Sequence, residues 1–107
     1  MNDYNNRLHP RICTDAAISC RHFTSVTVQP TDGVMRNYSR GGAYIETSCT
    51  FTPGTIVVLR VTLSQSKPLW LESFDGLRSL SLAEVKWVQA FSEGTPGRYG
   101  MGLRYLE

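Results

Sequence analysis

Apolar and polar residues alternate along most of this chain, with the two-residue period that is typical of β-strands. In segment 56–63 four aliphatic residues share one face, while Arg60 and Thr62 lie on the other. In segment 99–106 tyrosine, methionine and leucine alternate with two glycines and one arginine. Both segments are therefore predicted to be strands, and the first is predicted to be largely buried.

Turn signals separate shorter candidate strands nearer the N-terminus. Segment 23–30 alternates valine with serine and threonine, and Asp32-Gly33 follows it. Aspartate followed by glycine is the dipeptide that favours a two-residue hairpin turn, so a hairpin is predicted there. Further short strands are predicted at 34–36 and 43–46, with a kink between them.

The second half of the chain is less regular. Segment 80–91 is predicted to be a long strand with Val85 and Trp87 on the same face, although its residues also permit a helix over 79–88. Segment 64–79 combines loop and turn signals with a short apolar run, and its structure is left open.

About six strands separated by turns, without a firm helix, are typical of an antiparallel barrel or sandwich. A chain of 107 residues has the size of one domain. Closing the sheet removes exposed strand edges, so we predict a small six-stranded antiparallel β-barrel over residues 15–107. Residues 1–14 show no apolar period and are predicted to form a flexible N-terminal arm.

Composition narrows the function. The net charge is only +2, which is too small for a typical nucleic-acid-binding domain, so no DNA or RNA partner is expected. The longest aliphatic run, 56–59, is far shorter than a membrane span, and no apolar export segment opens the chain. We therefore expect a cytoplasmic protein without membrane insertion. Its three cysteines are too widely spaced for a zinc site and are expected to be reduced.

No catalytic constellation stands out. The two histidines, His9 and His22, have no metal-binding spacing, and no nucleophile motif occurs. The glycines of the last strand are not followed by the lysine of a phosphate-binding loop. We therefore expect no enzyme activity, no metal and no cofactor.

Two polar patterns remain. Arg7 and Arg11 lie four residues apart in the arm, which is a weak motif that a solvated basic arm would also show. Asn37, Ser39 and Gly42 form an Asn-x-Ser-x-x-Gly pattern, which is rare by chance at this composition. Asparagine and serine bond their own backbone and glycine permits close approach, so the pattern fits a tight polar turn as well as a binding site.

The order of these patterns resembles that of the PilZ domain. The resemblance includes Val85-x-Trp87 and the closing Tyr-Gly-Met-Gly-Leu-Arg-Tyr-Leu, and it covers about residues 7–106. It implies a small β-barrel that binds the bacterial second messenger cyclic di-GMP. The site residues that it implies are Arg7, Arg11, Asn37, Ser39 and Gly42, with Trp87 and Gly102 as possible lining residues.

The chemistry of this ligand fits these residues. Arginine contacts guanine O6 and N7 through two hydrogen bonds, and it also pairs with phosphate. Asn37 and Ser39 can bond a second guanine edge, and Gly100 and Gly102 would leave room for a flat ring. Asn6 precedes Arg7 where many family members have another arginine, so binding of one molecule or of a stacked pair stays open.

As a domain that stands alone, such a sensor would need an effector protein. The resemblance implies control of motility, surface polysaccharide or biofilm, and a monomer or weak dimer is expected. A PilZ-like adaptor that binds no nucleotide is the alternative. A barrel that binds single-stranded nucleic acid is a weaker one, because +2 gives little attraction to a phosphate backbone.

Overall fold

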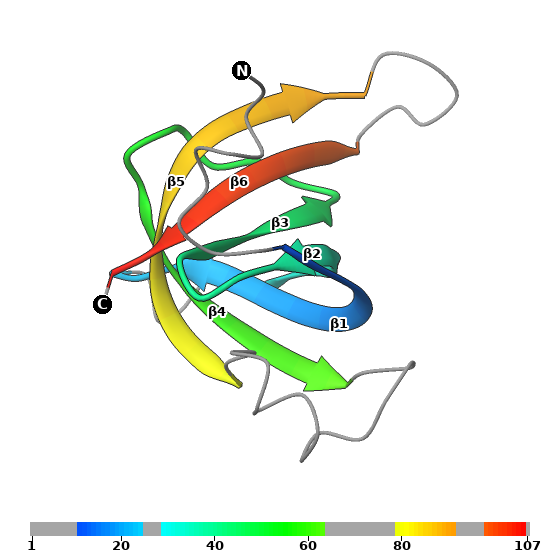
Figure 1. Cartoon of the computed structure of the whole chain (residues 1–107). Helices are drawn as coiled ribbons and strands as arrows, with labels where there is room; N and C mark the ends of the chain where they lie inside the picture. Colours follow the sequence, from blue (N-terminus) through cyan, green and yellow to red (C-terminus); the bar gives the residue numbers. More distant parts are fainter. Residues whose placement is uncertain (1–10, 25–28, 64–78, 92–97, 107) are drawn as a thin grey trace, which may run out of the picture.

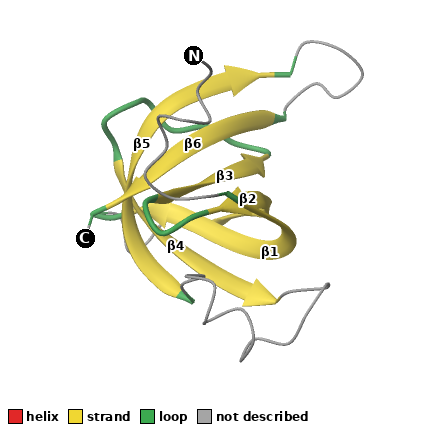
Figure 2. Cartoon of the chain, viewed as in Figure 1, coloured by secondary structure: helices red, strands yellow, loops and turns green. Residues whose placement is uncertain are grey.

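The computed structural model describes residues 11–24, 29–63, 79–91 and 98–106. Within these ranges the chain forms six strands and no helix (Figure 2). The strands are β1 (Ile12–His22), β2 (Thr31–Tyr38), β3 (Gly42–Thr47), β4 (Ile56–Leu63), β5 (Leu80–Ala90) and β6 (Tyr99–Tyr105). The helix considered over 79–88 is therefore wrong, because these residues belong largely to β5.

The six strands close into one antiparallel barrel in the order β1-β2-β3-β6-β5-β4 (Figure 1). The predicted six-stranded barrel is confirmed. The strand β5 has different neighbours toward its two ends: residues 80–84 pair with β4 and residues 83–90 with β6, so the two pairings overlap at Ala83 and Glu84. In Figure 1 the two halves are the yellow and orange parts of the strand.

Alternate residues of every strand fill the barrel interior. In β4, Val57, Leu59 and Val61 are buried while Arg60 and Thr62 are exposed, as the pattern predicts. In β6, Met101, Leu103 and Tyr105 face the core. Burial of such side chains supplies the main stabilisation of the fold, at about 1.5–3 kcal/mol for a large aliphatic residue.

The predicted hairpin at Asp32-Gly33 is wrong. Both residues lie inside β2, where Asp32 pairs with Ser19 of β1 and Gly33 with Thr47 of β3. A Cβ atom at Gly33 would meet the carbonyl oxygen of Glu46, so the glycine serves close strand approach rather than a turn. The long β1 replaces the strand predicted over 23–30, of which residues 25–28 lie outside the described part.

Bulges interrupt the alternation at functionally interesting places. In β2 the register with β3 shifts between Met35 and Asn37, which leaves Arg36 as the extra residue. In β5 the register with β6 shifts between Val85 and Trp87. The prediction that Val85 and Trp87 share a face is therefore wrong: Val85 is fully buried, and Trp87 is 46% exposed.

The barrel begins earlier than the predicted residue 15. Its first strand, β1, starts at Ile12, inside the segment 1–14 that is predicted to be an arm. Residues 1–10 and 64–78 lie outside the described part, so the predictions for them stay predictions. In the portion of the chain that is described, no helix has the length and apolar character needed to cross a membrane.

Candidate ligand-binding surface

A row of residues runs across four strands on the outside of the barrel. Asn37 of β2 pairs with Tyr44 of β3, Tyr44 pairs with Gly102 of β6, and Gly102 pairs with Trp87 of β5. The bulges in β2 and β5 lie immediately before Asn37 and Trp87, and they turn both side chains outward. We call Asn37, Tyr44, Gly102 and Trp87 the cross-strand row.

The arginine motif meets the turn motif at one end of this row. Nη1 of the exposed Arg11 donates a hydrogen bond of 3.0 Å to Oδ1 of Asn37, although the two residues are 26 positions apart in the chain. The register explains the contact, because Cys13 of β1 pairs with Asn37 and Arg11 precedes β1. One arginine of the arm is thus held beside the Asn-x-Ser-x-x-Gly pattern.

The turn from β2 to β3 is built by that second pattern. Oγ of Ser39, which is 5% exposed, accepts a hydrogen bond of 3.1 Å from the backbone N–H of Gly41. The backbone N–H of Ser39 donates to the carbonyl oxygen of Gly42 at 2.8 Å. A Cβ atom at Gly42 would collide with the carbonyl oxygen of Leu103 in β6. These contacts fix the turn, and the predicted ligand role of Ser39 and Gly42 stays a prediction.

Two aromatic rings cover the outward face of β6. Tyr44 and Trp87 stack, with ring centroids 5.6 Å apart and an interplanar angle of 24°. A Cβ atom at Gly100 would touch the ring of Tyr44, and one at Gly102 would overlap the ring of Trp87. The space that the two glycines leave is therefore filled by the protein's own rings. A flat ligand ring would pack on the exposed part of Trp87 rather than on Gly102.

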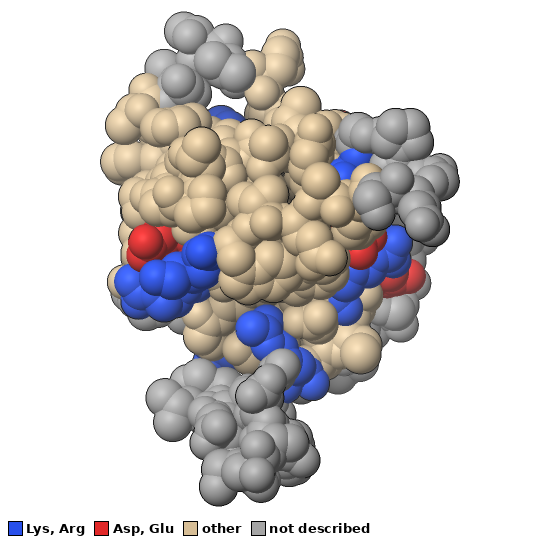
Figure 3. All heavy atoms as spheres, turned by 90° about the horizontal axis from the view of Figure 1, so that it is seen from above, with Lys and Arg blue, Asp and Glu red and all other residues tan. Residues whose placement is uncertain are grey.

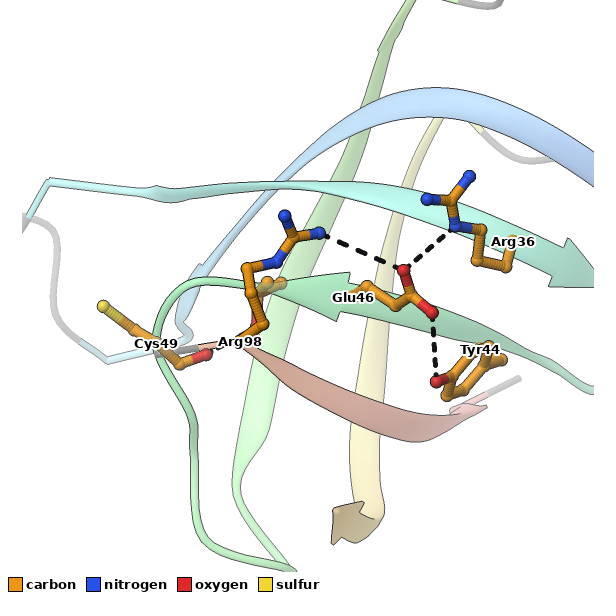
Figure 4. Close-up of polar contacts among 6 residues, drawn as sticks. Arg36, Tyr44, Glu46, Cys49 and Arg98 are labelled. Atoms are coloured by element: carbon orange, nitrogen blue, oxygen red, sulfur yellow. Dashed lines mark hydrogen bonds and ion pairs between the residues drawn. The ribbon is translucent and has the colours of Figure 1, made fainter. Parts of the chain in front are cut away.

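A carboxylate holds this aromatic pair in place (Figure 4). The hydroxyl of Tyr44 donates to Oε2 of Glu46 at 3.3 Å, and Oε1 of Glu46 lies 3.0 Å from Nε of Arg36 and 4.0 Å from Nη2 of Arg98. Burial, then the charge of Glu46 and the hydrogen bond to it, raise the pKa of the Tyr44 phenol. Tyr44 is therefore a neutral hydrogen-bond donor at physiological pH.

The acidic groups on this side lie beside basic ones. Figure 3, which shows the molecule from above, has each visible acidic group beside a basic one. Glu46 meets Arg36 and Arg98, and Glu84 meets Arg104 at 3.2 Å. The described residues contain no cluster of three or more histidines, cysteines or acidic residues that could hold a metal ion. The groups that this surface offers to a ligand are therefore the guanidinium of Arg11, the amide of Asn37 and the ring of Trp87.

The structure brings together several of the residues predicted for the site. Arg11 contacts Asn37, and Trp87 lies in the same cross-strand row; Arg7 lies outside the described residues. Sequence reasoning missed Tyr44 and Glu46. Their signal was the alternation Ala-Tyr-Ile-Glu over 43–46, which places the polar pair on the outward face of a strand.

Comparison with known families agrees with this architecture. A model of the PilZ domain matches residues 5–107, which is nearly the whole chain. The chain therefore belongs to the PilZ family, a family of binding modules that in general bind cyclic di-GMP or act as adaptors toward effector proteins. A search of the curated proteins found no match.

Proposed function

We propose that this protein is a cyclic di-GMP receptor of the bacterial cytoplasm that signals to an effector protein. The observation that carries the proposal is the 3.0 Å hydrogen bond from Arg11 to Asn37, because it unites the two predicted ligand motifs on one surface. It complements the family membership, which by itself is compatible with an adaptor that binds no nucleotide.

The ligand would be recognised by charge, hydrogen bonding and stacking together. The Arg11 guanidinium would exchange its bond to Asn37 for two bonds to a guanine edge or to a phosphate oxygen. That exchange frees the Asn37 amide, which both donates and accepts, for the second guanine. The exposed ring of Trp87 would cover a purine face at the other end of the row.

The signal would be the ordering of the N-terminal arm around the ligand. Arg7 would supply the second arginine, and residues 5–11, which precede β1, would lose conformational freedom on binding. This entropic cost lowers affinity, but it makes the difference between the free and bound protein large enough for an effector to read. The processes under control would be motility, surface polysaccharide or biofilm formation.

Titration calorimetry with cyclic di-GMP tests the receptor function. The wild-type protein should bind, and Arg7→Ala, Arg11→Ala and Asn37→Ala should each weaken binding at least about tenfold, or about 1.4 kcal/mol. Ser39→Ala should weaken it too, and circular dichroism must show that the barrel is intact. Arg60→Ala is the matched control, because Arg60 is an exposed arginine of β4, on the opposite side of the barrel order from β3.

Amide hydrogen exchange tests the arm separately. Residues 5–11 should exchange more slowly when cyclic di-GMP is bound, whereas the core strands, β1 included, should change little. Equally fast exchange with and without the nucleotide would refute arm ordering while leaving binding intact. No heat at all in the wild-type titration would favour the adaptor, in which the same barrel binds proteins only.

A further inference from the structure

Four aliphatic side chains share the outer surface where β4 meets the first half of β5. Leu80 and Leu82 of β5 are 54% and 40% exposed, Leu106 is 39% exposed, and Val58 is partly exposed. Val58 pairs with Leu82, and the backbone N–H of Leu106 donates to the carbonyl oxygen of Leu82 at 3.1 Å. We call Val58, Leu80, Leu82 and Leu106 the leucine patch.

The leucine patch contradicts the pattern of a solvated sheet face. The inward positions of β5 on this side are occupied by core residues such as Ala83 and Val85, so Leu80 and Leu82 point away from the core. Outward positions of an antiparallel sheet are normally polar. Single exposed leucines need no explanation, but several that adjoin one another mark an interaction surface.

Two arginines adjoin the leucine patch on its β1 and β4 side. Arg21 of β1 pairs with Val58, and Arg60 of β4 pairs with Leu80. Throughout the described ranges, no acidic side chain forms an ion pair with either arginine. The nearby Glu84 is held by Arg104 at 3.2 Å and by Lys86 at 3.8 Å. The patch thus combines apolar area with positive charge that the barrel leaves uncompensated.

We infer that the leucine patch docks an acidic amphipathic segment of a partner protein, with leucine-like anchors on one face and carboxylates toward Arg21 and Arg60. A carboxylate forms a bidentate pair with an arginine, which fixes orientation as well as charge. The apolar side chains supply the buried centre of the contact, and the arginines lie at its rim.

Charge favours this occupant over two others. In a two-fold contact between two copies, the same patch faces itself, which would bring the arginines of both copies toward one surface. An anionic membrane is held by clusters of about 4–8 basic residues, and the patch has two. A negatively charged polypeptide needs only the two pairs that the surface provides.

The leucine patch is separate from the proposed nucleotide site. The patch adjoins the half of β5 that pairs with β4, and Trp87 lies beyond the bulge, in the half that pairs with β6. The inference therefore stands or falls without cyclic di-GMP, and its test uses the nucleotide-free protein.

The test is a methyl and amide NMR titration of the full chain with synthetic peptides. The first probe is an amphipathic helical peptide with leucine on one face and glutamate on the other, and the second carries lysine in place of each glutamate. The glutamate peptide should shift signals of Leu80, Leu82, Leu106 and Val58 and bind at least about tenfold more tightly than the lysine peptide. This preference should shrink as salt is added.

Substitutions separate the apolar from the electrostatic contribution. Leu82→Ser should weaken binding of the glutamate peptide at least about tenfold, and Arg60→Glu should remove the preference between the two peptides, because Arg21 then faces a carboxylate of the barrel itself. Both positions are exposed, so the barrel should stay folded. Gln89→Ser is the matched control: it changes an exposed side chain of the same strand outside both the leucine patch and the cross-strand row, and peptide binding should persist.

Five results would overturn the inference. Equal binding of both peptides would remove the role of charge, and signal changes confined to the cross-strand row would place the contact elsewhere. Sedimentation that shows a dimer lost in Leu82→Ser would assign the patch to a second copy, and binding to phosphatidylserine vesicles in preference to the peptide would assign it to a membrane. Nuclear Overhauser contacts from residues 64–78 of the same chain to Leu82 would likewise leave no room for a partner.

Discussion

The two halves of β5 present different surfaces. The first half, beside β4, alternates regularly and exposes Leu80 and Leu82. The second half, beside β6, follows a bulge at Lys86 and exposes Trp87, which stacks on Tyr44. One strand thus carries an apolar surface on one side of the bulge and an aromatic, hydrogen-bonded surface on the other.

The difference shows what a bulge contributes to a small barrel. In the regular half, side-chain direction follows from sequence parity, so the core and the outer surface are fixed together. In the bulged half, one extra residue changes which side chains face outward without opening the barrel. Bulges at Arg36 and Lys86 place Asn37 and Trp87 in one row, so the bulges assemble the candidate site.

The largest effect on stability is expected in the core beside the regular half of β5. Leu59 of β4 is fully buried, so Leu59→Ala should lower the free energy of unfolding by about 2–5 kcal/mol. Leu82→Ala, on the outer surface, should change it by no more than about 0.5 kcal/mol. Urea denaturation measures both. Similar losses for the two variants would contradict the assignment of Leu82 to the outside.

The next largest effect on stability is expected at two glycines of β3 and β6, the strands beside the bulged half of β5. Gly42→Ala places a methyl group against the Leu103 carbonyl, which cannot move independently, and should cost about 3 kcal/mol. Gly102→Ala meets the side chain of Trp87, which can tilt into solvent, and should cost less. Combining Gly102→Ala with Trp87→Ala should recover part of that loss in a double-mutant cycle, and simple additivity would show that the ring does not lie on Gly102.

Alkaline pH provides a third comparison. Burial raises the pKa of the Cys20 thiol, in the core beside β4, from 9.0 to about 12. Below pH 9 the thiol is protonated in both the folded and the unfolded protein, so it does not lower the free energy of unfolding. As pH rises from 9 toward 12, only the unfolded protein readily loses this proton, and the free energy of unfolding falls, by about 2 kcal/mol at about pH 10.5. Cys20→Ala should flatten this slope. The pKa of Tyr44 is also raised in the folded protein. Tyr44→Phe should therefore flatten only the part of the stability slope that begins near the usual tyrosine pKa. An unchanged slope in Cys20→Ala would contradict the expected burial effect.

The smallest effect is expected at Glu46. Glu46→Gln weakens contacts to Arg36, Arg98 and Tyr44 and should cost about 1 kcal/mol, since exposed arginines limit the gain from each pair. Glu84→Gln, whose partners are also exposed, is the matched control and should cost less. Ultraviolet titration of Glu46→Gln should show a lower Tyr44 pKa, because the Glu46 charge helps to raise it.

The sequence predicts the regular half well and the bulged half poorly. Burial of Val57, Leu59 and Val61 follows from parity alone. The two-residue alternation gives the wrong side-chain direction at Trp87. A bulge depends on how two distant strands pair, and no local pattern around Lys86 marks it. Gly33 misled for a similar reason: glycine permits a turn, but here it permits contact with the β3 backbone.

The candidate site was only partly accessible from local patterns. Arg11 and Asn37 belong to recognisable motifs, and the contact between them follows once β1 and β2 are paired. Tyr44 and Glu46 carry no motif, and their importance depends on the stack with Trp87 and the ion pairs with Arg36 and Arg98. Tertiary pairing therefore determines the members that the motifs do not include.

Closure of the six described strands has a consequence for how partner molecules can recognise this protein. Every strand in the order β1-β2-β3-β6-β5-β4 already has two hydrogen-bonded neighbours. A visiting peptide therefore finds no described strand with one side open along its whole length, as β-augmentation prefers; in that mode backbone groups supply affinity with little regard to sequence. Recognition of this barrel therefore depends chiefly on side chains, so a single outward substitution can change which partner it binds.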